Sequence, residues 1–162
     1  MSLALVRIDD RLIHGQVVEG WIPYLKVDQV LVVSDAAAAD EIQITLMRLA
    51  LPDAIDLEVL PVAVAARHPA FNPDYLRHVL VLAPGPQEVL GLLEKGAVFS
   101  RVNVGGLHYT AGRVQLGKAI FLSEQDKEAL RSISRRGVKL EGRALPGERE
   151  SDLSPAIGAQ AI

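Results

Sequence analysis

Short apolar runs rich in β-branched residues recur along the chain, and stretches whose apolar residues have helical spacing separate them. The apolar runs predict strands at 3–8, 29–33, 57–60, 78–83, 100–104, 118–122 and 138–143. The intervening stretches predict helices at 14–21, 36–51, 61–67, 86–96 and 123–137. Continuous apolar strands that alternate with helices are typical of an α/β fold, with a mostly parallel central sheet and helices on both of its faces.

The chain has 162 residues, which suits a single domain with a sizeable core. We expect residues 1–146 to form this domain, because no repeat or linker interrupts the alternation of elements. The tail at 147–162 has no apolar period and mixes Gly, Ser, Pro and charged residues. It is expected to be a peripheral arm that docks on another surface, and its sequence assigns it no role.

Composition narrows the class of protein further. Apolar residues make up 49% of the chain and charged residues 23%, which excludes a disordered chain, and the net charge of −3 gives no reason to expect a nucleic-acid partner. The absence of cysteine excludes disulfides, thiolate nucleophiles and cysteine-bound metals. Arg7, Asp9 and Asp10 interrupt the first apolar run, so no secretory signal is expected. No uncharged apolar run approaches the ~18 residues of a membrane helix, and we expect a cytoplasmic protein.

Candidate chemistry is concentrated where the first strand ends. In parallel α/β sheets, sites lie beyond the carboxyl ends of the strands, which here are followed by loops at 9–15, 34–38 and 103–112. The first loop belongs to the run VRIDDRLIHGQV, which starts at Val6. Two arginines, two aspartates and a histidine fall within eight residues of this mostly apolar segment. This grouping makes the run the first candidate for a functional site.

Phosphoryl chemistry explains these residue types. Imidazole has an unperturbed pKa of about 6.5, so a neutral His14 is a nucleophile that can take up a phosphoryl group and release it later. Arg7 and Arg11 can donate several hydrogen bonds to the phosphoryl oxygens. Gly15 and Gln16 begin the next helix, where backbone N–H groups and the helix dipole favour an anion. Gly15 also removes a Cβ where the backbone would approach the phosphoryl group.

The two aspartates have two interpretations that the sequence leaves open. Asp9 or Asp10 can hold an arginine or fix the tautomer of the imidazole, as carboxylates do for catalytic histidines. Alternatively, both cap the helix and pair with the arginines at the surface, and His14 is an ordinary residue of the first turn.

The other two loops carry weaker candidates. Asn103, Gly105 and Gly106 end a predicted strand, where paired glycines form either an anion-binding nest of N–H groups or an ordinary tight turn. Ser34 and Asp35 end the second predicted strand and either contact the same site or cap the following helix.

Metal and cofactor sites are not expected. The four histidines show no metal-ligand spacing with a carboxylate, so we assign no metal. The sequence has neither a glycine-rich dinucleotide motif after a strand nor a P-loop, so no nucleotide cofactor is expected. His68 and His78 are interpreted as surface residues, and His108 as a solvated loop residue or a second-layer group of the site.

The run VRIDDRLIHGQV resembles the signature of enzyme IIB of the mannose/fructose/sorbose family of the bacterial phosphoenolpyruvate-dependent sugar phosphotransferase system. The resemblance covers about residues 3–146. It continues in VLVVSDAAAAD, NVGG, the pair Gly112-Arg113, FLSEQDKEAL and GVKLEGRALP. The chain departs from the family at Ser34-Asp35, where two acidic residues are expected.

The resemblance implies an α/β sandwich and a protein-phosphohistidine–sugar phosphotransferase activity. It implies that His14 is phosphorylated through Nδ1, that Arg11 and Arg7 assist transfer, and that no metal or cofactor takes part. The phosphoryl donor would be a IIA phosphohistidine, and the acceptor a sugar held by membrane IIC/IID components. Peripheral association with that membrane complex and a homo-oligomer are compatible with the resemblance.

Two other functions remain open at this point. A regulatory phosphocarrier would use the same His14 chemistry to signal phosphorylation status without sugar transport. A non-catalytic module would bind an anionic metabolite reversibly in the same positive cleft.

Overall fold

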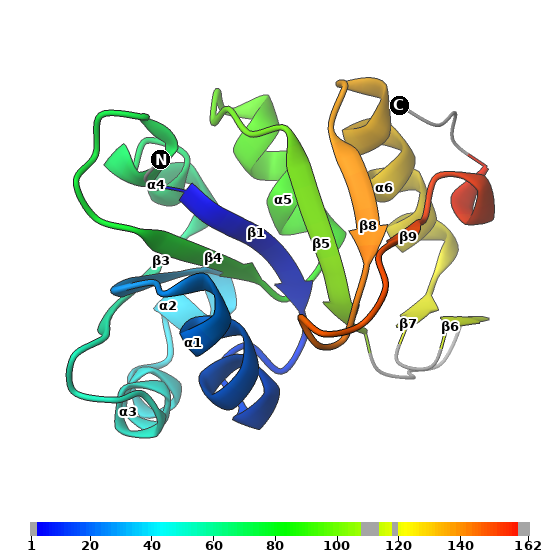
Figure 1. Cartoon of the computed structure of the whole chain (residues 1–162). Coiled ribbons are helices and arrows are strands. Elements are labelled where there is room, and N and C mark those ends of the chain that lie inside the picture. Colours follow the sequence, from blue (N-terminus) through cyan, green and yellow to red (C-terminus); the bar gives the residue numbers. More distant parts are fainter. Residues whose placement is uncertain (1–2, 108–113, 118–119, 159–162) are drawn as a thin grey trace.

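A seven-stranded sheet forms the centre of the computed structural model, which describes residues 3–107, 114–117 and 120–158 (Figure 1). The strand order is β3-β2-β4-β1-β5-β8-β9, and every neighbouring pair is parallel except β8 and β9. A separate antiparallel pair is formed by β6 (Val114–Gly117) and β7 (Ile120–Leu122). The strands of the main sheet are β1 (Leu3–Asp9), β2 (Gln29–Val33), β3 (Asp56–Leu60), β4 (Val79–Ala83), β5 (Arg101–Gly106), β8 (Lys139–Gly142) and β9 (Ser151–Asp152).

Helices cover both faces of this sheet, so the expected α/β fold is confirmed (Figure 1). One face carries α4 (Val62–Ala65), α5 (Pro86–Glu94) and α6 (Glu124–Arg135). The other carries the π-helix η1 (Gln16–Trp21), α1 (Ile22–Leu25), α2 (Asp35–Ala38) and α3 (Glu41–Ala50). The described residues also form two short 3-10 helices, η2 (Pro69–Phe71) and η3 (Pro155–Ile157). None of the helices in the described ranges is long and apolar enough to cross a bilayer.

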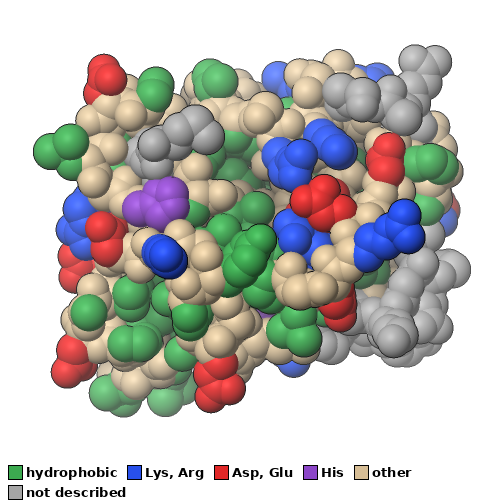
Figure 2. Space-filling model, viewed as in Figure 1, with side chains coloured by type: hydrophobic (Ala, Val, Ile, Leu, Met, Phe, Trp, Pro, Cys, Tyr) green, Lys and Arg blue, Asp and Glu red, His purple; other side chains and the backbone are tan. Residues whose placement is uncertain are grey.

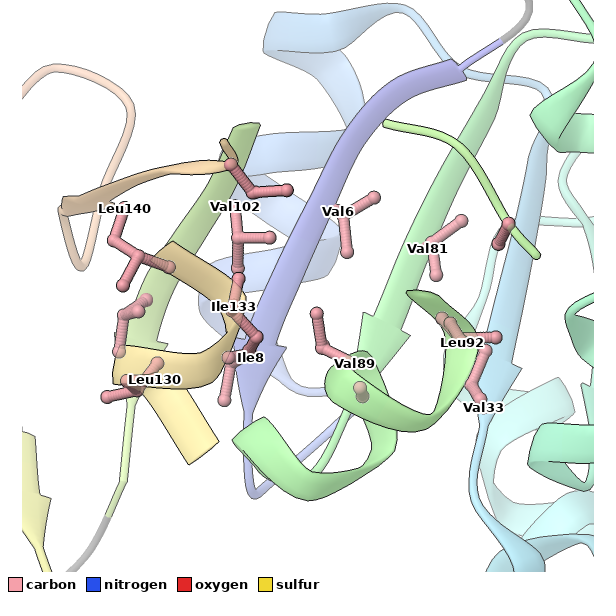
Figure 3. Close-up of a cluster of buried hydrophobic side chains, with 14 of the residues drawn as sticks. Val6, Ile8, Val33, Val81, Val89, Leu92, Val102, Leu130, Ile133 and Leu140 are labelled. Carbon is pink, nitrogen blue, oxygen red and sulfur yellow. The ribbon is translucent and has the colours of Figure 1, made fainter. Parts of the chain in front are cut away.

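Alternation along β1 sends different residues to the two faces. Val6 and Ile8 point toward α5 and α6, where they join the larger apolar core (Figure 3). Arg7 and Asp9, one position along, face the opposite side and are also fully buried. The strand therefore places two charged groups inside the molecule on the face that carries η1.

Three sequence predictions differ from the observed elements. The helix predicted at 36–51 is two helices, because Asp40 has extended backbone and its carboxylate accepts a hydrogen bond from Gln43 N at 3.1 Å, which caps α3. The helix predicted to end at Trp21 continues to Leu25. The glycine pair at 105–106 lies inside β5 and not in a turn. Of the strand predicted at 118–122, β7 is observed, and 118–119 lie outside the described residues.

The segment after Gly147 packs against the rest of the chain. Strand β9 pairs antiparallel with β8, and Figure 1 shows η3 beside α6. Leu153 and Ile157 are buried in the larger core, and Arg131 of α6 donates to the carbonyl of Ile157 at 2.6 Å. The segment thus adds both a strand and apolar side chains to the domain.

Candidate active site

The carboxyl ends of β1 and β5 lie side by side, as the loop positions predicted. In the parallel register Arg7 is opposite Asn103, and Asp9 is opposite Gly106. The backbone N–H of Asp10 donates to the carbonyl of Gly106 at 2.8 Å, which ties the first loop to the end of β5. The run VRIDDRLIHGQV and the run NVGG therefore meet at the same edge of the sheet.

A tight turn after β1 brings His14 back over the end of the strand. Leu12 N donates to the carbonyl of Asp9 at 3.0 Å, and Leu12 itself has a φ of +57°. A positive φ is unusual for a leucine, and such conformations cluster at functional sites. Leu12 and Ile13 are buried in the smaller core, so apolar packing holds the turn in this conformation.

Asp9 connects the histidine to an arginine. Its Oδ2 lies 3.0 Å from His14 Nε2 and 3.0 Å from Arg7 Nη2, and its Oδ1 accepts from Arg11 N at 3.2 Å. Burial raises the pKa of Asp9, but the hydrogen bond with His14 and the charge of Arg7 outweigh that effect, so its pKa lies below the usual value. Asp9 is thus a buried carboxylate in direct contact with the imidazole, a position from which a carboxylate can orient the ring.

Arg7 lies in the interior and not at the surface. Its Nη1 donates to the side-chain oxygen of Asn103 and to the carbonyl of Arg143 at 2.9 Å, and its Nη2 donates to the carbonyl of Ala144 at 3.0 Å. The guanidinium also lies over the Trp21 ring, 4.8 Å from its centroid. Burial lowers the pKa of Arg7, while Asp9 opposes that shift. The sequence made Arg7 a candidate donor to a phosphoryl group, and the structure shows its Nη1 and Nη2 bonded to protein oxygens in the interior.

Arg11 is an exposed cation in the same loop as the histidine. Its side chain is 42% exposed, its Nη2 donates to Gln16 Oε1 at 3.0 Å, and its Nε lies 3.9 Å from Asp9 Oδ1. Gly15 has helical backbone, and a Cβ built on it meets no atom within 4 Å. The fold therefore does not itself require glycine at position 15, and the space above it is open to a ligand or partner.

The two glycines of β5 make room for the charged side chains of β1. A Cβ on Gly105 would lie 2.0 Å from Arg7 Cζ, and one on Gly106 would lie 3.1 Å from Asp9 Oδ1. This geometry favours a packing role for the pair over an anion-binding nest.

Ser34 and Asp35 are at the same edge of the sheet but are engaged elsewhere. Ser34 Oγ accepts from Ala37 N at 3.1 Å and caps α2, while Asp35 Oδ1 accepts from Val62 N at 2.8 Å. Strand β4 lies between β2 and β1. The structure thus joins Asp9, His14, Arg11 and Gln16 but does not bring these two residues to them.

Sequence reasoning missed the polar residues in β8 and directly after it. Glu141 is fully buried and accepts from Asn103 Nδ2 at 2.8 Å, and Arg143 donates to Glu141 from both Nε and Nη2. Figure 2 shows basic and acidic side chains gathered on the surface of the molecule over β5 and β8. The available signal was the alternation of polar residues in strands that are otherwise apolar. In the described part of the chain, no three His, Asp or Glu side chains converge to hold a metal ion.

Comparison with known proteins identifies the class. A family model described as "PTS system sorbose subfamily IIB component" matches residues 3–161. The fructose-specific EIIB component of Bacillus subtilis (strain 168) is 36% identical over 154 residues, which are 94% of this chain and 93% of that protein. The IIBSor domain of the sorbose permease from Klebsiella pneumoniae has a TM-score of 0.87 and 30% identity, covering 98% of this chain and 97% of that one. The chain therefore belongs to the sorbose subfamily of phosphotransferase-system IIB components.

Membership of this IIB subfamily identifies the reaction that the protein carries out. The protein accepts a phosphoryl group from a IIA component and transfers it to a sugar, and is therefore a sugar phosphotransferase. IIB components work with a IIA component and with membrane IIC and IID components. The mannose-specific EIIAB component of Escherichia coli (strain K12) is 39% identical over 146 residues, which are 90% of this chain and 45% of that protein.

Proposed function

We propose that His14 is the residue that carries the phosphoryl group, and that the group is attached to Nδ1. The observation that supports this is the 3.0 Å contact between His14 Nε2 and the buried carboxylate of Asp9. A carboxylate accepts hydrogen bonds only, so Nε2 holds the proton and Nδ1 holds the lone pair. The side chain of His14 is 14% exposed, which leaves part of the ring open to a phosphoryl donor.

Uptake is then a displacement at phosphorus. The Nδ1 lone pair of His14 forms a bond to phosphorus while the P–N bond to the IIA histidine breaks, and the IIA ring retains that electron pair. The His14 ring becomes cationic, because it now carries both the phosphoryl group and the Nε2 proton. Asp9 stabilises that charge in a buried setting, where a fixed carboxylate is more effective than water.

Transfer to the sugar breaks the bond between phosphorus and Nδ1 that uptake formed. A sugar hydroxyl oxygen attacks phosphorus, the bond to Nδ1 breaks, and His14 returns to the neutral ring with its proton on Nε2. The hydroxyl proton leaves to solvent. Because Nε2 keeps its proton, the ring leaves phosphorus as a neutral imidazole, which is a better leaving group than an imidazolate anion.

The exposed groups around His14 would bind the phosphoryl oxygens. We assign this role to the guanidinium of Arg11 and to the amides of Gly15 and Gln16, whose positions at the start of a helix leave their N–H groups without helical partners. Arg7 acts through Asp9 and does not touch the phosphoryl group. The IIA component would dock over this exposed rim, and donation would bring the chain to the membrane IIC/IID components. A homo-oligomer stays a prediction.

Phosphorylation of a histidine variant tests the assignment. The full chain is incubated with phosphoenolpyruvate, the general phosphotransferase proteins and a IIA component, and its intact mass is measured. We expect His14→Ala to take up no phosphoryl group while its circular dichroism is unchanged. The matched control His78→Ala should be labelled like the wild type. Acid-labile phosphate on the His14→Ala protein would overturn the assignment, and phosphorus–nitrogen couplings in NMR would overturn Nδ1 if they showed attachment at Nε2.

A further inference from the structure

A row of buried polar side chains leads from the histidine across three neighbouring strands. Asp9 and Arg7 lie on β1, Asn103 on β5 and Glu141 on β8, and all four side chains are 0% exposed. Arg143 closes the row beyond Glu141, so two cations and two carboxylates balance. Every link between neighbours in this row is a hydrogen bond.

The direction of these hydrogen bonds depends on Glu141. A carboxylate only accepts, so Asn103 turns its NH₂ group toward Glu141 Oε1, at 2.8 Å. The amide oxygen of Asn103 therefore faces the other way, where it accepts from Arg7 Nη1. If the amide were reversed, its NH₂ group would face the guanidinium, and two donors would meet without an acceptor.

The position of Arg7 in turn determines the position of Asp9. The hydrogen bond from Arg7 Nη1 to the side-chain oxygen of Asn103 helps to fix the plane of the guanidinium. Nη2 of the same guanidinium donates to Asp9 Oδ2, which is the oxygen that contacts His14. Planar guanidinium groups transmit orientation in this way because their N–H directions are rigidly related.

We propose that Glu141 is a positioning residue for phosphoryl transfer: it fixes the amide of Asn103, which holds Arg7 against Asp9 and so keeps the His14 ring aligned. The proposal rests on His14 being the phosphoryl carrier. Nothing in it requires Glu141 to contact the phosphoryl group or either partner.

If the charge of Glu141 only stabilises the fold, Glu141→Gln should have the same kinetics as a variant that loses another carboxylate beside Arg143. Glu150 provides this matched control. Glu150 Oε1 lies 3.4 Å from Arg143 Nη2 and 3.1 Å from Arg101 Nη1, and its side chain is 42% exposed. Glu150→Gln therefore removes the same charge from the same arginine without touching Asn103.

The first experiment compares Glu141→Gln with Glu150→Gln in the full chain. We expect Glu141→Gln to lower kcat for phosphoryl uptake from phosphorylated IIA about ten-fold, because small misplacements of a reacting group are costly. KM for IIA should stay within two-fold, since the docking surface is unchanged. The ¹⁵N signal of His14 Nε2 should shift as its bond to Asp9 weakens. Glu150→Gln should match the wild type in all three measurements.

A reciprocal swap separates positioning from stability. In the double variant Asn103→Asp with Glu141→Gln, the amide and the carboxylate exchange places, so an oxygen still faces Arg7 and the total charge is unchanged. We expect the swap to restore kcat to within about three-fold of the wild type and to restore the His14 signal, as a coupled pair should in a double-mutant cycle. The swap also keeps the test decisive if Glu141→Gln alone fails to fold.

The outcomes are distinguishable. Equal kinetics for the two single glutamine variants, or a double variant no better than Glu141→Gln, would overturn the positioning role while His14 remained the carrier. A wild-type protein phosphorylated at a residue other than His14 would overturn both the carrier assignment and this inference.

Discussion

Arg11 is the side chain whose chemistry most directly separates two models of the site. Guanidinium and ammonium share a charge but differ in hydrogen-bonding geometry. If Arg11 grips the phosphoryl oxygens, Arg11→Lys should slow transfer by about ten-fold or more, which corresponds to only about 1.4 kcal/mol. We expect a larger loss in donation to sugar than in uptake from IIA, because the sugar hydroxyl is a poor nucleophile. Single-turnover measurement of each half-reaction gives the two values.

Arg48→Lys on the exposed face of α3 is the control for this substitution, and it should leave both rates unchanged. Near-wild-type rates for Arg11→Lys in both half-reactions would show that Arg11 contributes only to a positive surface.

Gly15 and Gly105 should respond in opposite ways to the same added methyl group. A Cβ on Gly105 would lie 2.0 Å from Arg7 Cζ, so Gly105→Ala should destabilise the fold by about 2 kcal/mol or more. A Cβ on Gly15 meets nothing within 4 Å on a helical backbone, so Gly15→Ala should raise stability by about 0.5 kcal/mol. Because that methyl group occupies the space open to the phosphoryl group, Gly15→Ala should slow transfer several-fold.

Urea unfolding gives both stabilities, and the phosphorylation assay gives the rate. A Gly15→Ala protein that transferred at the wild-type rate would contradict close approach of the phosphoryl group to this part of the backbone.

The sequence selected a group of neighbouring residues that the structure brings together, but gave no sign of the depth at which one of them lies. Residue type and position were enough to select His14, both arginines and the aspartate pair Asp9-Asp10 as candidates, because strand ends in parallel sheets are where sites lie. Arg7 was a candidate donor to the phosphoryl group, because its charge gives no sign of the Asn103 oxygen and the backbone carbonyls that accept from its Nη1 and Nη2 in the interior. Those partners come from strands far along the chain, so no local pattern reveals them.

At the scale of elements, the first turn of α5 contains a carboxylate whose charged form is disfavoured by burial. Glu88 Oε2 is buried and has no hydrogen-bond partner among the described residues. Burial raises the pKa of Glu88, Asp35 and Asp126 raise it further, and a hydrogen bond to its own backbone N–H opposes them. A carboxyl whose pKa is higher in the folded state than in the unfolded one costs stability as pH rises from the unfolded value through the folded value.

Glu88→Gln should therefore stabilise the protein at pH 7 but not at pH 4, where Glu88 is largely protonated in both states. We expect a gain in Tm of about 2 °C at pH 7, measured by differential scanning calorimetry. Glu94→Gln, at the other end of the same helix, is the control and should give no such difference between the two pH values. If the difference in Tm between pH 4 and pH 7 were the same for Glu88→Gln as for the wild type, this account would be refuted.

Helices and strands were predictable in kind, but their boundaries depended on single contacts. Apolar runs marked each parallel strand of the sheet because both of its faces are covered. The break between α2 and α3 was missed because alanines favour a continuous helix, and only the cap by Asp40 shows where the second one begins. The inclusion of Gly105 in β5 was missed because a glycine pair ordinarily indicates a turn, whereas here the strand needs the missing Cβ.

At the scale of the whole molecule, the segment after Gly147 contributes to the core. Leu153 is 6% exposed and belongs to the larger core, so Leu153→Ala should lower the free energy of unfolding by about 3 kcal/mol. Leu76→Ala is the control, because Leu76 is 97% exposed and the change should stay within about 0.5 kcal/mol. Chemical denaturation of both variants checks the pair, and equal stabilities would mean that the segment is a dispensable arm.

Global topology was the part of the fold least accessible to pattern reasoning. The alternation of elements predicts a parallel sheet, but not that β8 lies beside β5. That neighbour relation places Glu141 next to Asn103, 38 positions apart in sequence. Residues that support the site from a distance therefore become visible only once the strand order is known.

The surroundings of Trp21 give the protein a built-in optical reporter. The chain has one tryptophan, whose indole N–H donates to the carbonyl of Ala144 at 2.9 Å and whose ring faces the guanidinium groups of Arg7 and Arg143, with centroid distances of 4.8 and 5.2 Å. Indole emission responds to nearby charge, and Arg7 is bonded to the carboxylate that orients His14. Loading and unloading of the carrier should therefore change the intrinsic fluorescence, so that turnover can be followed in real time without a label.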